Sequence, residues 1–232
     1  MNTTILPKLP YTIYYINLDR RPDRRTHMEH VLKNNTALRI SAVDYQNNFA
    51  PYNVIKHSGL ILGEHGCICS HIIALNMYLT TSTDEYAFIA EDDIENTYSQ
   101  YWKKYHYDLL TSDKFDILQM QTTSDKYNNS SMTEIKFRES GAAFYRIRRN
   151  NAQKIVDTFY NKITNTINLT LHNYPVADNL IWDFGSVYLI PMISYLNVKD
   201  SDTMPENINM NEYWTNFFSN AKTKYLQYWK NI

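Results

Sequence analysis

Three consecutive carboxylates, Glu91, Asp92 and Asp93, follow the apolar run 86–90 and could hold a metal ion. Adjacent negative charges repel one another, and a divalent cation bound between them removes that repulsion. Oxygen ligands without clustered Cys or His suit Mn²⁺ or Mg²⁺, and Mg²⁺ commonly takes further ligands from a substrate's phosphates. A solvated acidic turn before the next helix would use the same residues, so the triplet alone leaves both interpretations open.

Four arginines lie in the segment 16–25, "INLDRRPDRR", which begins at the end of another apolar run. Guanidinium groups match phosphate oxygens in a bidentate fork, and the free amides at the start of a helix favour an anion. A basic loop beside an acidic metal site would bind a diphosphate. The alternative is a solvated helix start, in which Asp23 is a favourable acid of the first turn.

The segment 63–71, "GEHGCICSH", combines glycines with polar side chains where a helix is expected to begin. Gly63 and Gly66 allow close approach of another backbone segment. Its two cysteines and two histidines match no zinc-binding spacing, so we expect no zinc site made of these four residues. Cys67 is expected to pack as a small apolar residue.

The elements that would position these residues follow a regular pattern, in which short apolar strands alternate with amphipathic helices. The pattern predicts strands at 11–18, 38–43, 86–90, 115–121 and 141–147, and helices at 26–34, 65–79 and 149–160. Such alternation is typical of βαβ units, so the predicted fold class is α/β, with a mostly parallel central sheet flanked by helices. Open α/β sheets bind ligands at the carboxyl ends of their strands, where the triplet and the arginines should meet.

Composition limits the class of protein further. A chain of 232 residues with 44% hydrophobic and 20% charged residues suits one globular domain over 1–232, with a core at about 11–195. A net charge of -1 gives no reason to expect a nucleic-acid partner. Two cysteines close together indicate a reduced, cytoplasmic compartment. No apolar run approaches the roughly 20 residues of a membrane-spanning helix.

The C-terminal segment, about 205–232, is expected to be a helical tail. Aromatic residues recur in it at near-helical spacing with lysines between them; they are Trp214, Phe217, Phe218, Tyr225 and Trp229, with Lys222, Lys224 and Lys230. Such a helix can lie on a membrane surface, which would make the protein a peripheral one. It can also pack against its own domain, and we favour that interpretation.

The order of the motifs resembles glycosyltransferase family 25, which includes bacterial lipopolysaccharide galactosyltransferases and collagen hydroxylysine galactosyltransferases. "INLDRRPDRR", "AVD" at 42–44, "GEHGCICSH" and "FIAEDD" are similar to motifs that follow one another in that family. The similarity continues through "GAAFYRIRRNNAQKIV" and "PVADNLIWD", and it covers about 11–191. Several motifs in the same order are more specific than any one of them.

The resemblance implies a GT-A-like fold, a Rossmann-like nucleotide-sugar domain, and Mn²⁺ or Mg²⁺ as cofactor. The donor substrate would be a UDP-sugar, usually UDP-galactose, and the partner a glycan or another glycosylatable acceptor. Carried onto this chain, the metal ligands are Asp93, as the principal one, and Glu91. The residues that would border the nucleotide are Asn17, Leu18, Arg21, Arg24, Ala42, Asp44, Glu91 and Asp92. Glu64 and His71 are expected to hold the shape of the pocket.

Family members are generally inverting enzymes, so an acceptor hydroxyl should attack the anomeric carbon while a carboxylate removes its proton. Asp178 is the first candidate for this base and Asp183 the second. Asp178 could instead merely cap the helix expected at 179–184. Two other functions remain open: a non-catalytic module that binds nucleotide-sugars or glycans, and a metal-dependent phosphohydrolase.

Overall fold

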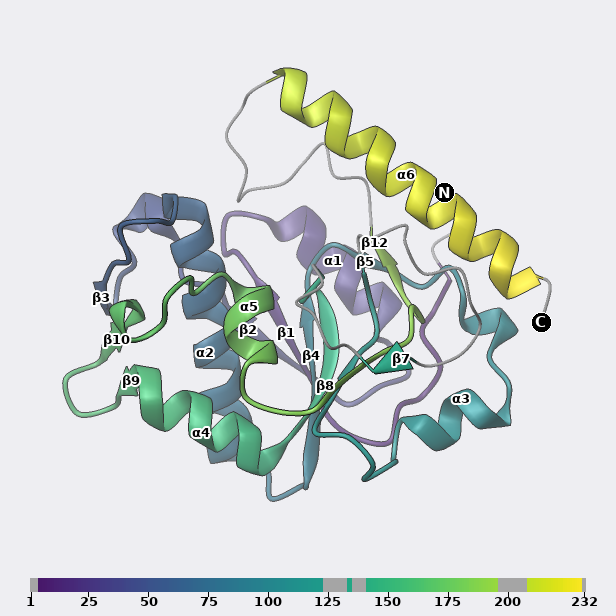
Figure 1. Cartoon of the computed structure of the whole chain (residues 1–232), viewed down its shortest axis with the longest axis horizontal. Coiled ribbons are helices and arrows are strands. Elements are labelled where there is room, and N and C mark those ends of the chain that lie inside the picture. Colours follow the sequence, from purple (N-terminus) through teal and green to yellow (C-terminus); the bar gives the residue numbers. More distant parts are fainter. Residues whose placement is uncertain (1–3, 123–132, 135–140, 196–207, 231–232) are drawn as a thin grey trace.

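The computed structural model describes residues 4–122, 133–134, 141–195 and 208–230, in which strands and helices alternate (Figure 1). Its helices are α1 (Pro22–Val31), α2 (Leu62–Thr81), α3 (Lys104–Leu109), α4 (Arg149–Phe159), α5 (Ala177–Trp182) and α6 (Ile208–Lys230). Its strands are β1 (Ile13–Asn17), β2 (Ala37–Ser41), β3 (Asn53–Ile55), β4 (Tyr86–Glu91), β5 (Ile94–Glu95), β6 (Ile117–Gln119), β7 (Thr133–Glu134), β8 (Phe144–Arg148), β9 (Tyr160–Asn161), β10 (Thr166–Asn168), β11 (Val187–Leu189) and β12 (Ser194–Tyr195).

The central sheet has the strand order β2-β1-β4-β8-β6-β11-β7 within the described residues. β1 runs parallel to both β2 and β4, and β11 runs parallel to β6. β8 lies between β4 and β6 and is antiparallel to both, while β7 is antiparallel to β11. The predicted α/β fold with a mostly parallel sheet flanked by helices is therefore confirmed. The GT-A-like arrangement and the single-domain organisation stay predictions.

Two hydrophobic cores cover the two faces of this sheet. In β1, Tyr14 and Ile16 belong to one core, and Ile13 and Tyr15 belong to the other, as the alternation of side chains along a strand requires. Helices α2, α4 and α5 cover the first face, and α1 and α6 cover the second (Figure 1). Because both faces are buried, β1 and most of β4 are continuous apolar runs rather than alternating ones.

The C-terminal helix α6 packs against its own domain. Ala221, Tyr225 and Trp229 are buried in the second core, and the Trp229 ring stacks on that of Tyr98, with 6.2 Å between ring centroids. The Trp229 indole N–H donates a hydrogen bond of 2.8 Å to the Pro191 carbonyl. These contacts support the interpretation of α6 as a packed helix.

Contact of this helix with a membrane surface stays a prediction. The side chains of Trp214, Phe217 and Phe218, on which that interpretation depends, lie outside those that the structure describes. Among the described residues, no helix combines the length and the apolar character needed to cross a bilayer.

Candidate functional site

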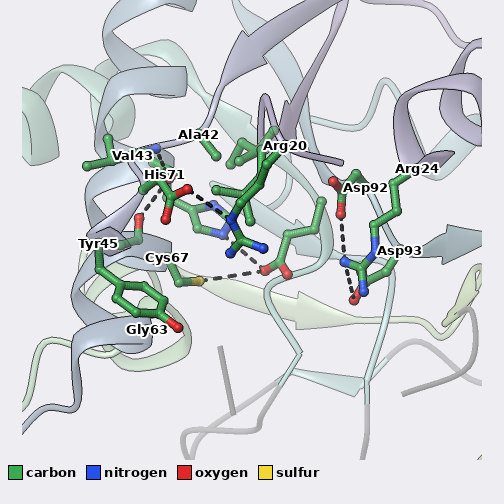
Figure 2. Close-up of a pocket in the computed structure, with 16 residues that line it drawn as sticks. Arg20, Arg24, Ala42, Val43, Tyr45, Gly63, Cys67, His71, Asp92 and Asp93 are labelled. Carbon is green, nitrogen blue, oxygen red and sulfur yellow. Dashed lines mark hydrogen bonds and ion pairs between the residues drawn. The ribbon is translucent and has the colours of Figure 1, made fainter. Parts of the chain in front are cut away.

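A pocket opens at the carboxyl ends of β1, β2 and β4 and encloses about 590 Å³, part of it open to solvent (Figure 2). The structure brings together here the acidic triplet, the arginine loop, the 42–45 segment and the first turns of α2. The lining residues are Ile16, Leu18, Arg20, Arg24, Ala42, Val43, Asp44, Tyr45, Gly63, Gly66, Cys67, Ser70, His71, Glu91, Asp92 and Asp93.

Asp92, the middle carboxylate of the triplet, is held by neighbouring protein groups. It is 7% exposed, and its two oxygens accept hydrogen bonds from the Asn17 amide at 2.6 Å and from Arg24 Nη1 at 2.9 Å. Asn17 is itself 1% exposed, and its Oδ1 accepts a hydrogen bond of 2.8 Å from Arg39 Nε. Asp92 and Asn17 therefore form a buried network that fixes the end of β1 against the end of β4.

The other two carboxylates face different groups. Glu91 Oε1 lies 3.2 Å from His71 Nε2 and 4.0 Å from the Cys67 sulfur, both on α2. Asp93 Oδ2 lies 4.0 Å from Arg24 Nη1, whereas its Oδ1 is buried and has no hydrogen-bond partner among the described residues. A buried carboxylate oxygen without a hydrogen-bond partner destabilises the folded state. A bound cation would stabilise Asp93 more than the other two members of the triplet.

Burial and neighbouring charge shift the pKa of two carboxyls at this site. Burial and the nearby Glu91 raise the pKa of Asp93 to about 8, although the Arg24 guanidinium acts in the opposite direction. Burial also raises the pKa of Asp178 to about 6, while the backbone N–H groups of Gly141 and Ala142 oppose that shift. The charged forms of both carboxyls are therefore disfavoured when no cation is bound.

These shifts predict how the stability of the metal-free protein depends on pH. A carboxyl whose pKa is raised in the folded state holds its proton more tightly there than in the unfolded chain. Its contribution is fully present below the unfolded pKa of 3.8 and is lost as the pH rises through the folded pKa, about 6 for Asp178 and about 8 for Asp93.

In the presence of a chelator, we expect the melting temperature of the parent protein to fall from about pH 4 to about pH 8 and to level off at higher pH. Asp93→Asn removes the part of this fall that lies at higher pH. At the upper end of the pH range the variant should therefore melt at least about 2–4 °C higher than the parent protein, the shift that ~1 kcal/mol produces in a chain of this size. Melting curves across this pH range measure the difference. Parallel pH profiles for the two proteins would contradict the shifted pKa of Asp93.

The arginine loop places two arginines and one leucine at the pocket. Leu18 and Arg24, which were predicted to border a nucleotide, are among its lining residues. Arg21 forms an ion pair with Asp23 at 2.8 Å and is not among the lining residues, whereas Arg20, which the sequence did not single out, is one of them. The sequence could not separate adjacent arginines, because the direction of each side chain depends on how the chain turns after β1.

The 42–45 segment forms the wall opposite the triplet. Ala42 and Asp44, which were predicted to border a nucleotide, line the pocket. Asp44 accepts a hydrogen bond of 2.9 Å from Arg20 Nε and another of 3.0 Å from the Gln46 amide. Tyr45 also lines the pocket and was not predicted.

Helix α2 packs directly on this segment, as the glycines of "GEHGCICSH" suggested. A Cβ atom at Gly66 would lie 2.8 Å from the Val43 carbonyl oxygen, closer than a real Cβ contact allows. The Ser70 hydroxyl adds a hydrogen bond, accepting from the Val43 amide at 2.8 Å. The expected close backbone approach is therefore present at Gly66.

The cysteines and histidines of α2 do not form one cluster. The ring nitrogens of His65 form hydrogen bonds with the backbone of His57 and Ile61. Cys69 is buried in the first core. His71 lines the pocket and contacts Glu91, which agrees with its expected role in holding the shape of the pocket. Glu64 instead accepts a hydrogen bond of 2.9 Å from the Ile61 amide at the start of α2.

The two candidate bases lie at opposite ends of α5. Asp178 lies in the first turn of α5, two residues after the N-cap residue Val176, and accepts a hydrogen bond of 2.9 Å from the Ala142 amide. Its charge, like that of Glu91, is close enough to Cys67 to raise the pKa of that thiol. Asp183 pairs with His172 at 2.8 Å and is not among the residues that line the pocket. Asp178 is therefore the carboxylate near the triplet, although it does not itself line the pocket.

One of three comparisons with known proteins agrees with the motif order. No curated protein matches the chain. A solved structure with the heading "Crystal Structure of A197 from STIV" is 11% identical, covers 79% of this chain and 83% of its own, and has a TM-score of 0.43, too low to indicate a shared fold. The family described as Glycosyltransferase family 25 (LPS biosynthesis protein) matches residues 11–171, well over half of the chain. The chain therefore belongs to glycosyltransferase family 25.

Proposed function

We propose that the protein transfers a hexose, with galactose as the first candidate, from a UDP-sugar to a saccharide or a hydroxylated acceptor. The observation that carries the proposal is the pocket itself, which combines crowded carboxylates, two arginines and an apolar floor at the carboxyl ends of parallel strands. Sugar-nucleotide chemistry needs each of these parts, because the donor has a diphosphate, a nucleoside and a reactive anomeric carbon.

The residues present fit a divalent cation. Asp93 presents a buried, unpartnered oxygen, and Glu91 and Asp93 are close enough for the charge of one to raise the pKa of the other. Carboxylate oxygens are the ligands that Mn²⁺ and Mg²⁺ prefer, so these two residues would hold the ion. When bound, the ion would supply positive charge for the departing diphosphate.

The protein's own side chains would bind and orient the donor. Arg20 and Arg24 lie where they can donate hydrogen bonds to phosphate oxygens, and Leu18 and Tyr45 offer apolar surface to the nucleoside. Asp92 would act indirectly, because its contacts with Arg24 and Asn17 fix the arginine at the edge of the pocket.

The reaction is proposed to invert the configuration at the anomeric carbon. The acceptor oxygen forms a bond to this carbon as the bond to the diphosphate breaks, and the hydroxyl proton passes to Asp178. A carboxyl with a pKa of about 6 is ionised near neutral pH and is a better base than an ordinary aspartate. The position of Asp183 beside His172 favours Asp178 for this role.

A thermal-shift series with UDP-, GDP- and CMP-sugars, each with and without Mn²⁺, tests the proposal. A ligand at ~100 times its dissociation constant should add ~2.7 kcal/mol of stability. Stabilisation by UDP-sugars that requires Mn²⁺, with turnover to UDP, supports a glycosyltransferase. Binding without turnover would identify a binding module, and phosphate release from simple esters would identify a phosphohydrolase.

The two neighbouring arginines allow a matched test of the diphosphate contact. Arg20→Ala removes a guanidinium that lines the pocket, so UDP affinity should fall by roughly 10- to 100-fold, the equivalent of one hydrogen bond to a charged group. Arg21→Ala removes the same charge one residue away, beside Asp23, and should change the affinity less. Isothermal titration with UDP in the presence of Mn²⁺ measures both. Equal losses would show that only net charge matters.

A further inference from the structure

Three side chains of different chemistry converge on the α2 wall of the pocket. Cys67 and His71 are four residues apart on α2, so they lie one above the other on the same helix face. Glu91, at the end of β4, reaches the same point from the sheet. The sulfur, imidazole nitrogen and carboxylate oxygen all lie within 4.8 Å of one another. Figure 2 shows Cys67 and His71 on this wall, with a dashed line from the sulfur to the carboxylate.

The distances between these atoms suit a tetrahedral metal ion. Bonds of about 2.0 Å to nitrogen or oxygen and about 2.3 Å to sulfur, set at a tetrahedral angle, separate nitrogen from oxygen by roughly 3.3 Å and sulfur from either by roughly 3.5 Å. The observed separations are 3.2 Å from His71 Nε2 to Glu91 Oε1 and 4.0 Å from the Cys67 sulfur to the same oxygen. The sulfur and the imidazole nitrogen lie within 4.8 Å of each other, so side-chain movements of up to roughly 1.3 Å would bring the three atoms to bonding distance.

Contacts with Tyr145 hold the His71 ring in an orientation that suits metal binding. His71 is fully buried, its Nδ1 lies 3.1 Å from the Tyr145 hydroxyl, and the two rings stack with 5.7 Å between centroids. A partner on one ring nitrogen fixes the orientation in which the other nitrogen can bind a metal. Carboxylates surround the thiol as well, so the position attracts positive charge.

We propose that Cys67, His71 and Glu91 form a site for a borderline-soft divalent cation, Zn²⁺ by its ligand chemistry. Sulfur and imidazole ligands select zinc or cobalt, whereas the oxygen ligands of Asp93 select manganese or magnesium. Three protein ligands leave the fourth tetrahedral position for water or for an oxygen of a molecule in the pocket. Glu91 is the ligand that this site shares with the acidic triplet.

Cobalt gives the site a spectroscopic test that needs no substrate. The metal-free protein is titrated with Co²⁺, because a cysteine thiolate bound to Co²⁺ produces an intense charge-transfer absorption in the near ultraviolet. We expect one equivalent of Co²⁺ to produce this band, and Zn²⁺ to abolish it by displacement. Absence of the band at saturating Co²⁺ would overturn the proposal.

Variants assign the band to particular residues. Cys67→Ser should abolish it, and His71→Gln should weaken Co²⁺ binding by at least roughly 10-fold, the lower end of what changes around a metal ligand cost. Cys69→Ala is the matched control, since it removes the chain's other cysteine from the core and should leave the band unchanged. A band that persists in Cys67→Ser, in protein with an unchanged melting temperature, would assign the thiolate elsewhere and reject the site.

The outcome is separable from that of the proposed function, whose test is Mn²⁺-dependent binding of UDP. A parent protein that shows the Cys67 band but does not bind UDP retains this site and rejects the proposed function. A protein that binds UDP with Mn²⁺ but shows no band rejects this site alone.

Discussion

Asp178→Asn is expected to reduce the rate of sugar transfer by roughly 10²–10⁴-fold, the contribution usual for a general base. The amide keeps the size of the side chain and an oxygen that can accept the hydrogen bond from the Ala142 amide, so the fold should be retained. It loses the ability to take a proton. Because Asp178 does not line the pocket around the triplet, Mn²⁺-dependent UDP binding should stay close to that of the parent protein.

Rates of transfer and UDP affinities, measured on the same preparations, separate catalysis from binding. Slow hydrolysis of UDP-sugar to water serves as the assay until an acceptor is found. Asp183→Asn is the matched control, because it changes a carboxylate at the other end of α5 that pairs with His172. A near-parental rate for Asp178→Asn would remove it from the role of base, and a loss of UDP binding would make it a binding residue instead.

The sequence predicted most of the elements because their local signals agree. β1 and β4 are uninterrupted apolar runs that end in polar residues, and the buried residues of α4, among them Ala152, Ile155 and Phe159, recur at helical spacing. The direction of each strand in the sheet was harder to predict. β8 begins close to its predicted position but runs antiparallel between β4 and β6. The direction of a strand depends on how the chain crosses the sheet, which hydrophobic periodicity does not encode.

The candidate site was predictable to the level of the sheet edge. Ligands bind at the carboxyl ends of parallel strands, and this rule predicted that the triplet, the arginine loop and the 42–44 motif lie at the same edge of the sheet. The direction of individual side chains was not predictable, so the sequence did not distinguish Arg20, which lines the pocket, from Arg21, which does not. Likewise, spacing along α2 relates Cys67 and His71 only to other residues of that helix, whereas Glu91, which completes the cluster, lies on another element.

Asp93→Asn is expected to weaken Mn²⁺-dependent UDP binding by more than roughly 100-fold, or about 2.7 kcal/mol. The physical reason is that the substitution removes one of the two carboxylate charges proposed to hold the cation. A neutral amide is a poorer ligand than a carboxylate for a hard cation. The fold should survive, because one buried oxygen of Asp93 has no hydrogen-bond partner among the described residues and the other lies 4.0 Å from Arg24.

Asp92→Asn is the contrasting variant in the same triplet. Asp92 accepts charge-assisted and amide hydrogen bonds from Arg24 and Asn17 in a buried setting, so its substitution should lower the melting temperature. Asp93→Asn, in contrast, should leave the melting temperature of the metal-free protein unchanged or raise it, because it removes a buried charge that the fold does not neutralise. Isothermal titration of UDP with and without Mn²⁺, combined with melting curves, distinguishes the two effects. Retained Mn²⁺-dependent affinity in Asp93→Asn would show that the cation is held elsewhere, because loss of the principal ligand cannot leave the metal site intact.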